Sequence, residues 1–221
     1  MTVVQFPGSQ NGGAFPAFFE DAPVVRMRDP LAEFLSSAKG GVMTYRYIDA
    51  VRLAGHSCPA VAGAWLMMVQ GLAWLYDEDV PERGAIEVHM RDGRDEGTTG
   101  VMASIATLVT GAGEETGFMG IGANHRFSRK GLLTFDAVID GRIGLRRRDT
   151  GQGVIIDINT ASVPHDREME ALMPLAISSK ADAAQLEWFG ALWQDRVRRM
   201  LIEHADDPKL VHLYEWRAGS H

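Results

Sequence analysis

The sequence predicts an α+β fold, in which an antiparallel or mixed sheet packs against a central apolar helix and further helices. Two observations carry this prediction. Residues 60–76 form a run that is apolar on almost every side of a helix, which is typical of a helix buried in the middle of a domain. Three β-rich runs separated by turn-forming residues follow later in the chain, at residues 132–139, 141–148 and 153–159.

The length and composition indicate one main domain that does not bind nucleic acid. With 221 residues, of which 46% are hydrophobic, the chain can build a well-buried core. Its 29 acidic and 22 basic side chains leave a formal net charge of -7, which repels the phosphate backbone of nucleic acids. Cys58 is the single cysteine, so one chain can form neither an internal disulfide nor a four-thiolate zinc or iron–sulfur site.

The sequence predicts a cytoplasmic protein without a membrane contact. Residues 1–13 lack the basic segment followed by a long apolar one that marks a secretory signal. The apolar run at 60–76 is interrupted by Gln70 and is shorter than the roughly 20 residues that a spanning helix needs. We therefore interpret it as a buried helix.

We predict three regions along the chain: an irregular arm at 1–28, an α+β core at 29–165 and a helical extension at 166–221. The arm is rich in Gly, Pro and Phe and has no sustained period. The extension contains a helix at about 181–204, whose apolar residues recur every three or four positions. We expect this extension to pack on the core or on the second subunit of a homodimer.

Two short helices are predicted before the central one. Asp29 followed by Pro30 is typical of a helix start, and Gly40-Gly41 would end that helix. A second helix begins near Thr44 and ends at Gly55, a residue type that often terminates helices.

Strands dominate the rest of the core. Residues 84–90 alternate apolar and polar side chains, which predicts a strand with one buried face, and residues 99–110 predict another buried helix. The three later β-rich runs are joined by short turns, which favours an antiparallel meander. The basic run at 146–148 falls in one of them, where alternation divides its charges between the two faces of the strand.

The strongest local signal for chemistry is the segment Gly55-His56-Ser57-Cys58-Pro59. Pro59 suits the first position of the apolar helix, which makes Cys58 its N-cap. Backbone N–H groups and the helix dipole favour a thiolate there, so the sulfur becomes a better nucleophile or metal ligand. His56 can turn its imidazole to the same side, and the pair suits zinc, iron or another transition metal. The alternative is that Cys58 is a small buried apolar residue and His56 a polar residue in a turn.

A metal site needs at least one further ligand. His125 is the best candidate, because it lies in a loop at 120–129 just before a strand. His89 is weaker, since its alternation places it beside Glu87 on the face opposite the apolar residues, as an exposed strand histidine.

Two further elements could bind an anion. Before the helix near residue 101, backbone N–H groups with Thr98 and Thr99 could receive a carboxylate, and Glu96 could act as a general acid or base. The alternative is an ordinary turn with an N-cap. Arg126 and Arg129 could clamp an anionic substrate or simply lie in an exposed loop. The preceding glycine-rich stretch matches neither of the common phosphate-binding fingerprints, and no serine-hydrolase elbow or zincin helix occurs.

Several segments together resemble the FmdE family, whose name comes from molybdenum formylmethanofuran dehydrogenase. The similarity covers roughly residues 44–164. It rests on Gly55-His56-Ser57-Cys58-Pro59 and on supporting motifs at 47–51, 96–100 and 110–129. The resemblance implies an α+β core, often dimeric, with a groove lined by His56 and Cys58 that can hold a metal. Two features differ: Ala54 stands where many relatives have a further histidine, and the cysteine-rich zinc finger of some relatives is absent from this sequence.

From these observations we predict a metal-binding protein, an enzyme or accessory factor for a small anionic metabolite or cofactor in C1 metabolism. His56, Cys58 and His125 would bind zinc or iron, and Cys58 with Glu96 would be catalytic. A ligand would be held by Thr98, Thr99, Arg126 and Arg129. Two alternatives use the same groove. One is a non-catalytic haem, tetrapyrrole or organic-cofactor carrier with Cys58 or His56 as axial ligand; the other is a metal-free Cys58 nucleophile paired with His56.

Overall fold

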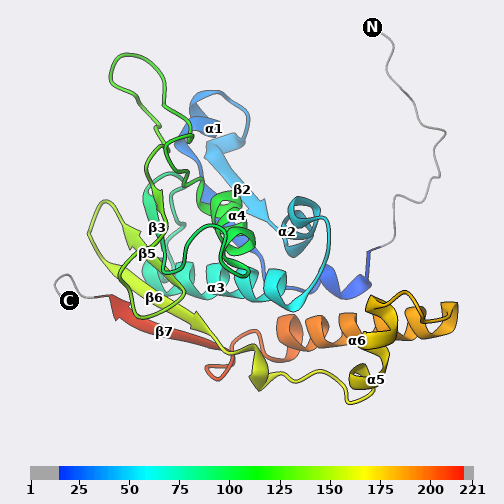
Figure 1. The fold of residues 1–221 in the computed structure, drawn as a ribbon. Coiled ribbons are helices and arrows are strands. Elements are labelled where there is room, and N and C mark those ends of the chain that lie inside the picture. The colour runs from blue at the N-terminus through cyan, green and yellow to red at the C-terminus, as the bar shows by residue number, and fades with distance from the viewer. Residues whose placement is uncertain (1–14, 217–221) are drawn as a thin grey trace, which may run out of the picture.

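The fold is α+β, as the sequence predicts. The computed structural model describes residues 15–216, and Figure 1 shows the larger sheet at one end of the molecule and α5 with α6 at the other. The larger sheet has five strands in the order β4-β3-β5-β6-β7, and β1 pairs with β2 in a second sheet. The helices are α1 Pro30–Phe34, α2 Tyr47–Ala54, α3 Pro59–Tyr76, α4 Thr99–Thr110, α5 Met169–Ile177 and α6 Ala183–Arg198. The strands are β1 Val25–Arg28, β2 Val42–Tyr45, β3 Ile86–Met90, β4 Leu133–Thr134, β5 Ile143–Arg147, β6 Gly153–Ile158 and β7 Val211–Trp216.

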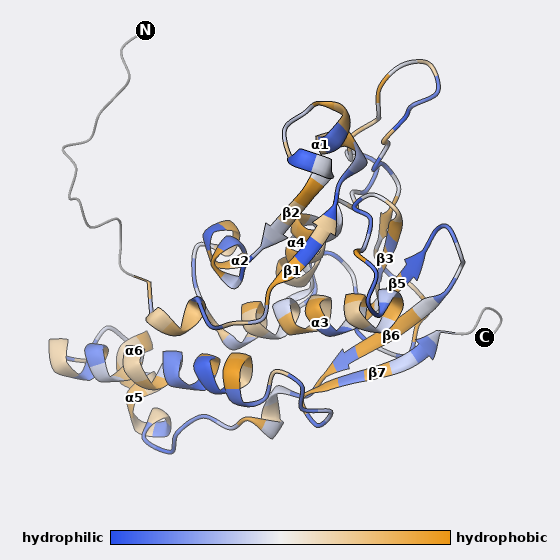
Figure 2. Cartoon of the chain, turned by 180° about the vertical axis from the view of Figure 1, so that it is seen from behind, coloured by the Kyte–Doolittle hydropathy of each residue, from blue (hydrophilic) through white to orange (hydrophobic). Residues whose placement is uncertain are grey.

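α3 is the central helix and begins as predicted, with Cys58 as N-cap and Pro59 at its first position. It packs against α4 and β6, and Figure 2 shows that it is mostly hydrophobic along its length. A side-chain carbon at Gly71 would overlap Ile156, so this glycine lets helix and sheet approach closely. α3 is long and apolar enough to cross a bilayer, but 67% of this stretch is buried inside the fold, as befits a core helix.

The larger sheet confirms the predicted strand at β3, where Ile86, Val88 and Met90 are buried. β5 and β6 pair antiparallel, as expected. The predicted meander is wrong for its first strand, because β4 pairs in parallel with β3 and is no neighbour of β5. The reason is the long connection from β3 to β4, which includes α4 and a loop and returns the chain in the same direction.

The N-terminal part contains both predicted helices and adds two strands. The predicted start of the second helix near Thr44 is wrong, because Thr44 lies in β2 and α2 begins at Tyr47. The Asp29 side chain caps α1, accepting from the N–H of Leu31 at 2.9 Å, and α1 ends at Phe34, before the predicted glycine pair. Residues 25–28, expected in the irregular arm, form β1, because their side chains alternate between the core and the surface. Residues 1–14 of the predicted arm lie outside the described residues.

The C-terminal part is a correction to the predicted helical extension. α6 is present and continues into a π-helical turn at Arg199–Glu203, and α5 precedes it. The chain then adds β7 to the larger sheet, antiparallel to β6 over its six residues. The sequence did not reveal this strand because its burial alternates only partly: Val211 is buried, whereas Glu215, which is four residues later and on the same face, is exposed.

Candidate functional site

The turn before α3 is built by the ends of two helices. α2 ends at Gly55, whose φ of 77° places it in the left-handed region that glycine tolerates. Cys58 then has extended backbone angles, and its side chain makes no cap hydrogen bond to the first turn of α3. Its side chain is half-buried and packs partly against the core. The predicted N-cap position of Cys58 is therefore confirmed.

Neutral hydrogen bonds hold this turn from two sides. The hydroxyl groups of Tyr47 and Ser57 lie 2.9 Å apart. The Ser57 carbonyl accepts from Trp193 Nε1 at 3.2 Å and from Gln194 Nε2 at 3.1 Å, both on α6. Burial raises the pKa of Tyr47 well above its ordinary value, against the smaller opposing effect of the hydrogen bond with Ser57, so Tyr47 stays a neutral partner. α2 and α6 together fix the segment that carries His56 and Cys58.

The structure does not bring the three predicted metal ligands together. His56 is exposed, with Nδ1 3.0 Å from the Ala54 carbonyl oxygen. His125 has Nδ1 3.1 Å from the Met119 carbonyl oxygen, in a loop that projects beside α1 and away from the start of α3 (Figure 1). Within residues 15–216, no three His, Cys, Asp or Glu side chains are grouped as a metal site requires. One chain therefore offers two donors, His56 and Cys58, which do not complete a metal centre by themselves.

The segment before α4 has the structure of an ordinary helix start. Thr98 occupies the N-cap position without a side-chain cap bond, and Thr99 is buried, with only 6% of its surface exposed. Glu96 is exposed, and its carbonyl oxygen accepts from the Thr99 N–H at 3.0 Å. Thr99 thus faces the interior, while Glu96 and Thr98 face solvent.

His89 is less exposed than the sequence suggests. It shares the face of Glu87, as predicted, but only 21% of its side chain is exposed, because the Trp216 ring packs edge-on at 4.9 Å. Its Nδ1 lies 2.9 Å from the Thr134 hydroxyl. Burial lowers the pKa of His89, and the charge of Arg146 adds to this effect against the opposing pull of Glu87. The prediction of an exposed strand histidine is therefore corrected: β7, which the sequence did not reveal, covers it.

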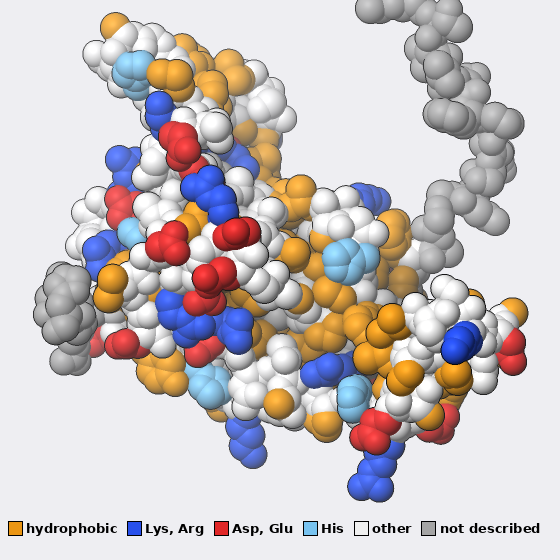
Figure 3. All heavy atoms as spheres, viewed as in Figure 1, with side chains coloured by type: hydrophobic (Ala, Val, Ile, Leu, Met, Phe, Trp, Pro, Cys, Tyr) orange, Lys and Arg blue, Asp and Glu red, His pale blue; other side chains and the backbone are white. Residues whose placement is uncertain are grey.

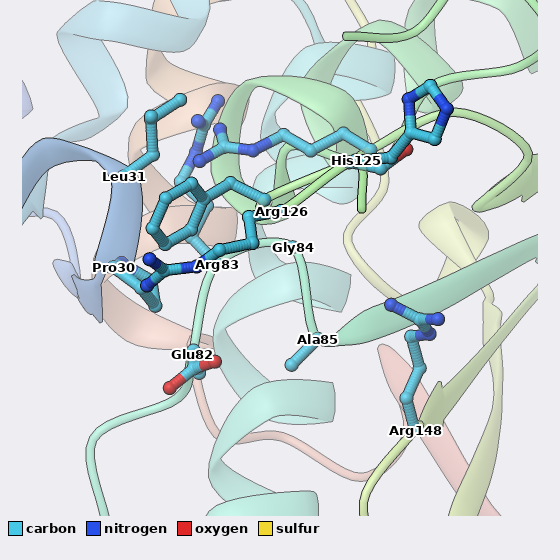
Figure 4. Close-up of a pocket in the computed structure, with 12 residues that line it drawn as sticks. Pro30, Leu31, Glu82, Arg83, Gly84, Ala85, His125, Arg126 and Arg148 are labelled. Carbon is cyan, nitrogen blue, oxygen red and sulfur yellow. The ribbon is translucent and has the colours of Figure 1, made fainter. Parts of the chain in front are cut away.

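The structure gathers four arginines around one pocket of about 360 Å³, which we call the arginine pocket (Figure 4). Its arginines are Arg83, Arg126, Arg129 and Arg148, and the walls also include His125 and the start of α1. Two of its members, Arg126 and Arg129, were predicted to hold an anion. The pocket lies between α1, the strand start at β3 and the loop before β4.

A buried carboxylate fixes two of these arginines. Asp29 is 3% exposed, and both of its oxygens lie 2.6 Å from Arg129 Nη2, with Arg83 Nη1 at 3.2 Å. Arg83 also donates to the carbonyls of Leu108 and Val109 in the last turn of α4, where a cation is favourable. Burial raises the pKa of Asp29, but the hydrogen bonds and charge of Arg129, with help from Arg83, outweigh it and hold this pKa below its ordinary value. Asp29, Arg83 and Arg129 therefore form the charged floor of the pocket.

The other two arginines reach the opening of the pocket without a carboxylate partner among residues 15–216. Arg126 stacks on the Phe127 ring at 4.7 Å and on the Phe34 ring at 5.5 Å, which fixes the direction of its side chain. Figure 4 shows Arg126 and Arg148 on opposite sides of the backbone at Gly84 and Ala85. With Glu82 and Asp29 as the nearby carboxylates, the four arginines leave an excess of positive charge at this pocket.

This arrangement separates residues that the sequence placed in one site. His125, Arg126 and Arg129 share the arginine pocket, whereas His56 and Cys58 lie at the start of α3. Sequence reasoning missed Asp29, Arg83 and Arg148 as parts of a site. The sequence marks Asp29 only as a helix cap, and no local pattern indicates partners that are 54 and 100 residues away.

Comparisons with known proteins give little further information. No model of a known protein family matches the chain, and no curated protein matches it. Among solved structures, it is similar to an FmdE-like protein of the tungsten formylmethanofuran dehydrogenase type from Syntrophus aciditrophicus, with a TM-score of 0.41, 14% sequence identity and coverage of 80% of this chain and 74% of that chain. That protein is of the kind that the sequence motifs resemble.

Proposed function

We propose that this protein binds a small anionic metabolite, a carboxylate or phosphate compound, in the arginine pocket. The observation that carries the proposal is the pair Arg126 and Arg148, which reach the opening with no carboxylate to neutralise them among residues 15–216. The chain as a whole has a formal charge of -7, and Figure 3 shows acidic and basic side chains intermingled over its sheet end. A local excess of arginine is therefore a departure from the rest of the molecule.

The chemistry of the pocket suits an anion with two or more oxygens. A guanidinium group donates two parallel hydrogen bonds to a carboxylate or phosphate, and such charge-assisted bonds are among the strongest in proteins. Arg129 and Arg83 are already bound to Asp29, so they set the shape and the field of the floor. Arg126 and Arg148 remain to bind the ligand directly. A volume of about 360 Å³ lies in the range of small-molecule sites.

Calorimetric titration with phosphate, malonate and citrate tests this function, with acetamide as an uncharged control at matched ionic strength. We expect at least one anion to bind and Arg126→Ala or Arg148→Ala to weaken it tenfold or more, since a charged hydrogen bond contributes about 1.5–3 kcal/mol. Arg167→Ala is the matched control, because Arg167 is exposed and lies outside the pocket. Binding that is equally weakened by all three variants would reflect bulk charge and would contradict the proposal.

We propose a second function for the start of α3: binding of zinc or iron through His56 and Cys58. The supporting observation is that Cys58 lies at the N-terminus of an 18-residue helix and that its side chain makes no cap hydrogen bond, so the sulfur is available to a ligand. Since one chain supplies only two donors, a second copy or a further ligand must complete the coordination, which agrees with the expected homodimer. This function is independent of the arginine pocket.

Elemental analysis of the purified protein tests the metal function. We expect zinc or iron in the wild-type protein, loss of the metal in Cys58→Ala and His56→Ala, and retention in His212→Ala, a histidine on β7. Equal metal content in all four proteins, or none in any, would refute it. A visible absorption band that shifts in Cys58→Ala would indicate a tetrapyrrole instead, and rapid iodoacetamide labelling of a metal-free protein would indicate a free nucleophile.

A further inference from the structure

The face of the larger sheet opposite α3 has a pocket whose charged residues differ in sign from the arginines of the arginine pocket. Cross-strand pairing places His89, Gly144, Ile155 and Tyr214 in one row across β3, β5, β6 and β7. The next row holds Glu87, Arg146, Gly153 and Trp216. Buried residues such as Val88 and Ile156 occupy the other face, where α3 and α4 pack.

Two glycines seat the Trp216 ring on this face. A side-chain carbon at Gly144 would come within 2.8 Å of the indole, and one at Gly153 within 3.0 Å of the Trp216 side chain, so the two glycines let Trp216 lie close to the sheet. Arg146 lies 3.8 Å from the ring centroid and His89 packs against the ring edge. The position of the indole is thus determined by four residues of the sheet and does not depend on a loop.

Beside this indole lies a pocket of about 510 Å³, larger than the arginine pocket. Aromatic and aliphatic side chains form part of its wall, including Trp216, Tyr214 and Ile155. Its charged lining residues are all acidic: Asp140, Asp157 and Glu215. No Lys, Arg or His lines it within the part of the chain that the structure describes, residues 15–216.

The two aspartates differ in their pairing. Asp157 lies 3.3 Å from Arg142 Nε and also accepts from the N–H of Ile158. Asp140 is exposed and has no ion-pair partner among residues 15–216. Tyr214, which lines the same pocket, is 54% exposed, so a carboxylate and an accessible aromatic residue are available together.

We propose that this pocket binds a small organic cation, an ammonium compound with an apolar part. The carboxylate of Asp140 attracts the ammonium group, and aromatic faces such as Tyr214 stabilise a cation electrostatically. Ile155 and the rim of the Trp216 ring receive the apolar part. The site takes a ligand of the opposite charge to that of the arginine pocket, so the two sites are independent and can be tested separately.

The test uses choline and its uncharged isostere 3,3-dimethylbutan-1-ol, titrated into the full-length protein and followed by calorimetry. We expect choline to bind at least tenfold more tightly than the alcohol. Asp140→Asn and Tyr214→Ala should each weaken choline binding by about fivefold to tenfold. Asp206→Asn is the matched control, because it removes one exposed carboxylate outside the pocket.

Circular dichroism of each variant establishes that it is folded before titration. Equal affinity for choline and the alcohol would show a merely apolar surface, and equal effects of Asp140→Asn and Asp206→Asn would show unspecific attraction by net charge. Absence of choline binding at tens of millimolar would also overturn the proposal. Asp140→Asn should bind phosphate in the arginine pocket as tightly as the wild type does. That result would show that a loss of choline binding in this variant comes from the pocket beside Trp216 and not from a general change in the protein.

Discussion

The start of α3 and the arginine pocket are held in place by different forces. The turn at Ser57 is fixed by neutral hydrogen bonds from Tyr47, Trp193 and Gln194. The pocket is fixed by a buried carboxylate, Asp29, that is shared between two arginines. A neutral bond that is lost can be replaced by water at a half-buried site, whereas a buried charge that loses its partner cannot. The two regions should therefore respond very differently to removal of one group.

The largest effect is expected from Asp29→Asn. Asparagine keeps the cap of α1, so the substitution removes the charge that faces Arg83 and Arg129 while leaving the capping oxygen. Breaking a buried pair by removing one partner costs about 3–5 kcal/mol, and we expect a loss of this order in the free energy of unfolding. Urea denaturation followed by circular dichroism measures it.

Glu82→Gln provides the control, because its pair with Arg28 is roughly half exposed on both sides. Exposed pairs contribute at most about 1 kcal/mol. Equal losses of stability in the two variants would contradict the prediction. They would mean that the pairs of Asp29 with Arg83 and Arg129 contribute no more than an exposed ion pair.

Acid should weaken the pocket before it affects the turn at Ser57. The pKa of Asp29 is held below its ordinary value of 3.8 in the folded state, so its contribution to stability is present above that value and is lost as the pH falls through the folded pKa. The difference in unfolding free energy between wild type and Asp29→Asn should therefore be constant above about pH 5 and shrink below about pH 4. Urea titrations of both proteins between pH 6 and pH 3 measure this; a difference that grew on acidification would mean the opposite sign of the pKa shift.

Ser57→Ala should cost more than Tyr47→Phe, although both remove the same hydrogen bond. Tyr47 is fully buried, so its hydroxyl is left without a partner when Ser57 is truncated, at a cost of about 1–3 kcal/mol. In Tyr47→Phe the half-buried Ser57 can bind water instead, and the loss should be about 1 kcal/mol or less. Thermal denaturation of the two variants compares them. A larger loss of stability in Tyr47→Phe than in Ser57→Ala would contradict this prediction, because it would mean that water cannot reach the hydroxyl of Ser57.

The smallest effect on stability is expected from Arg126→Ala, below about 1 kcal/mol, since this side chain is exposed and stacks on the rings of Phe34 and Phe127. It should nevertheless weaken anion binding tenfold or more. A variant that lost stability comparably to Asp29→Asn would show that Arg126 supports the fold and is not free for a ligand.

The elements that the sequence predicted are those with a local signal. α3 follows from its apolar composition and Pro59, β3 from strict alternation, and the end of α2 from Gly55. β1 was missed because it is only four residues long, although its side chains alternate, and β7 was missed because its alternation is only partial. β4 was assigned to the wrong neighbour, since pairing over a long connection leaves no mark in the sequence.

The same distinction applies to the candidate sites. The N-cap position of Cys58 is a local property and was predictable. The grouping of Arg129 with Asp29 depends on residues 100 positions apart, and the cover of His89 by Trp216 depends on a strand that was not recognised. For His125 the residue type was misleading. A histidine suggested a ligand of the Cys58 site, but the loop that carries it lines the arginine pocket.

The order of strands in the larger sheet has a consequence during synthesis. β6 lies between β5 and β7, but β7 is translated more than fifty residues later, after α5 and α6. Until β7 leaves the ribosome, the nascent chain presents one side of β6 with unpaired N–H and C=O groups, the kind of edge that recruits strands from other chains. Chains interrupted before residue 211 should therefore be the forms of this protein most prone to aggregate.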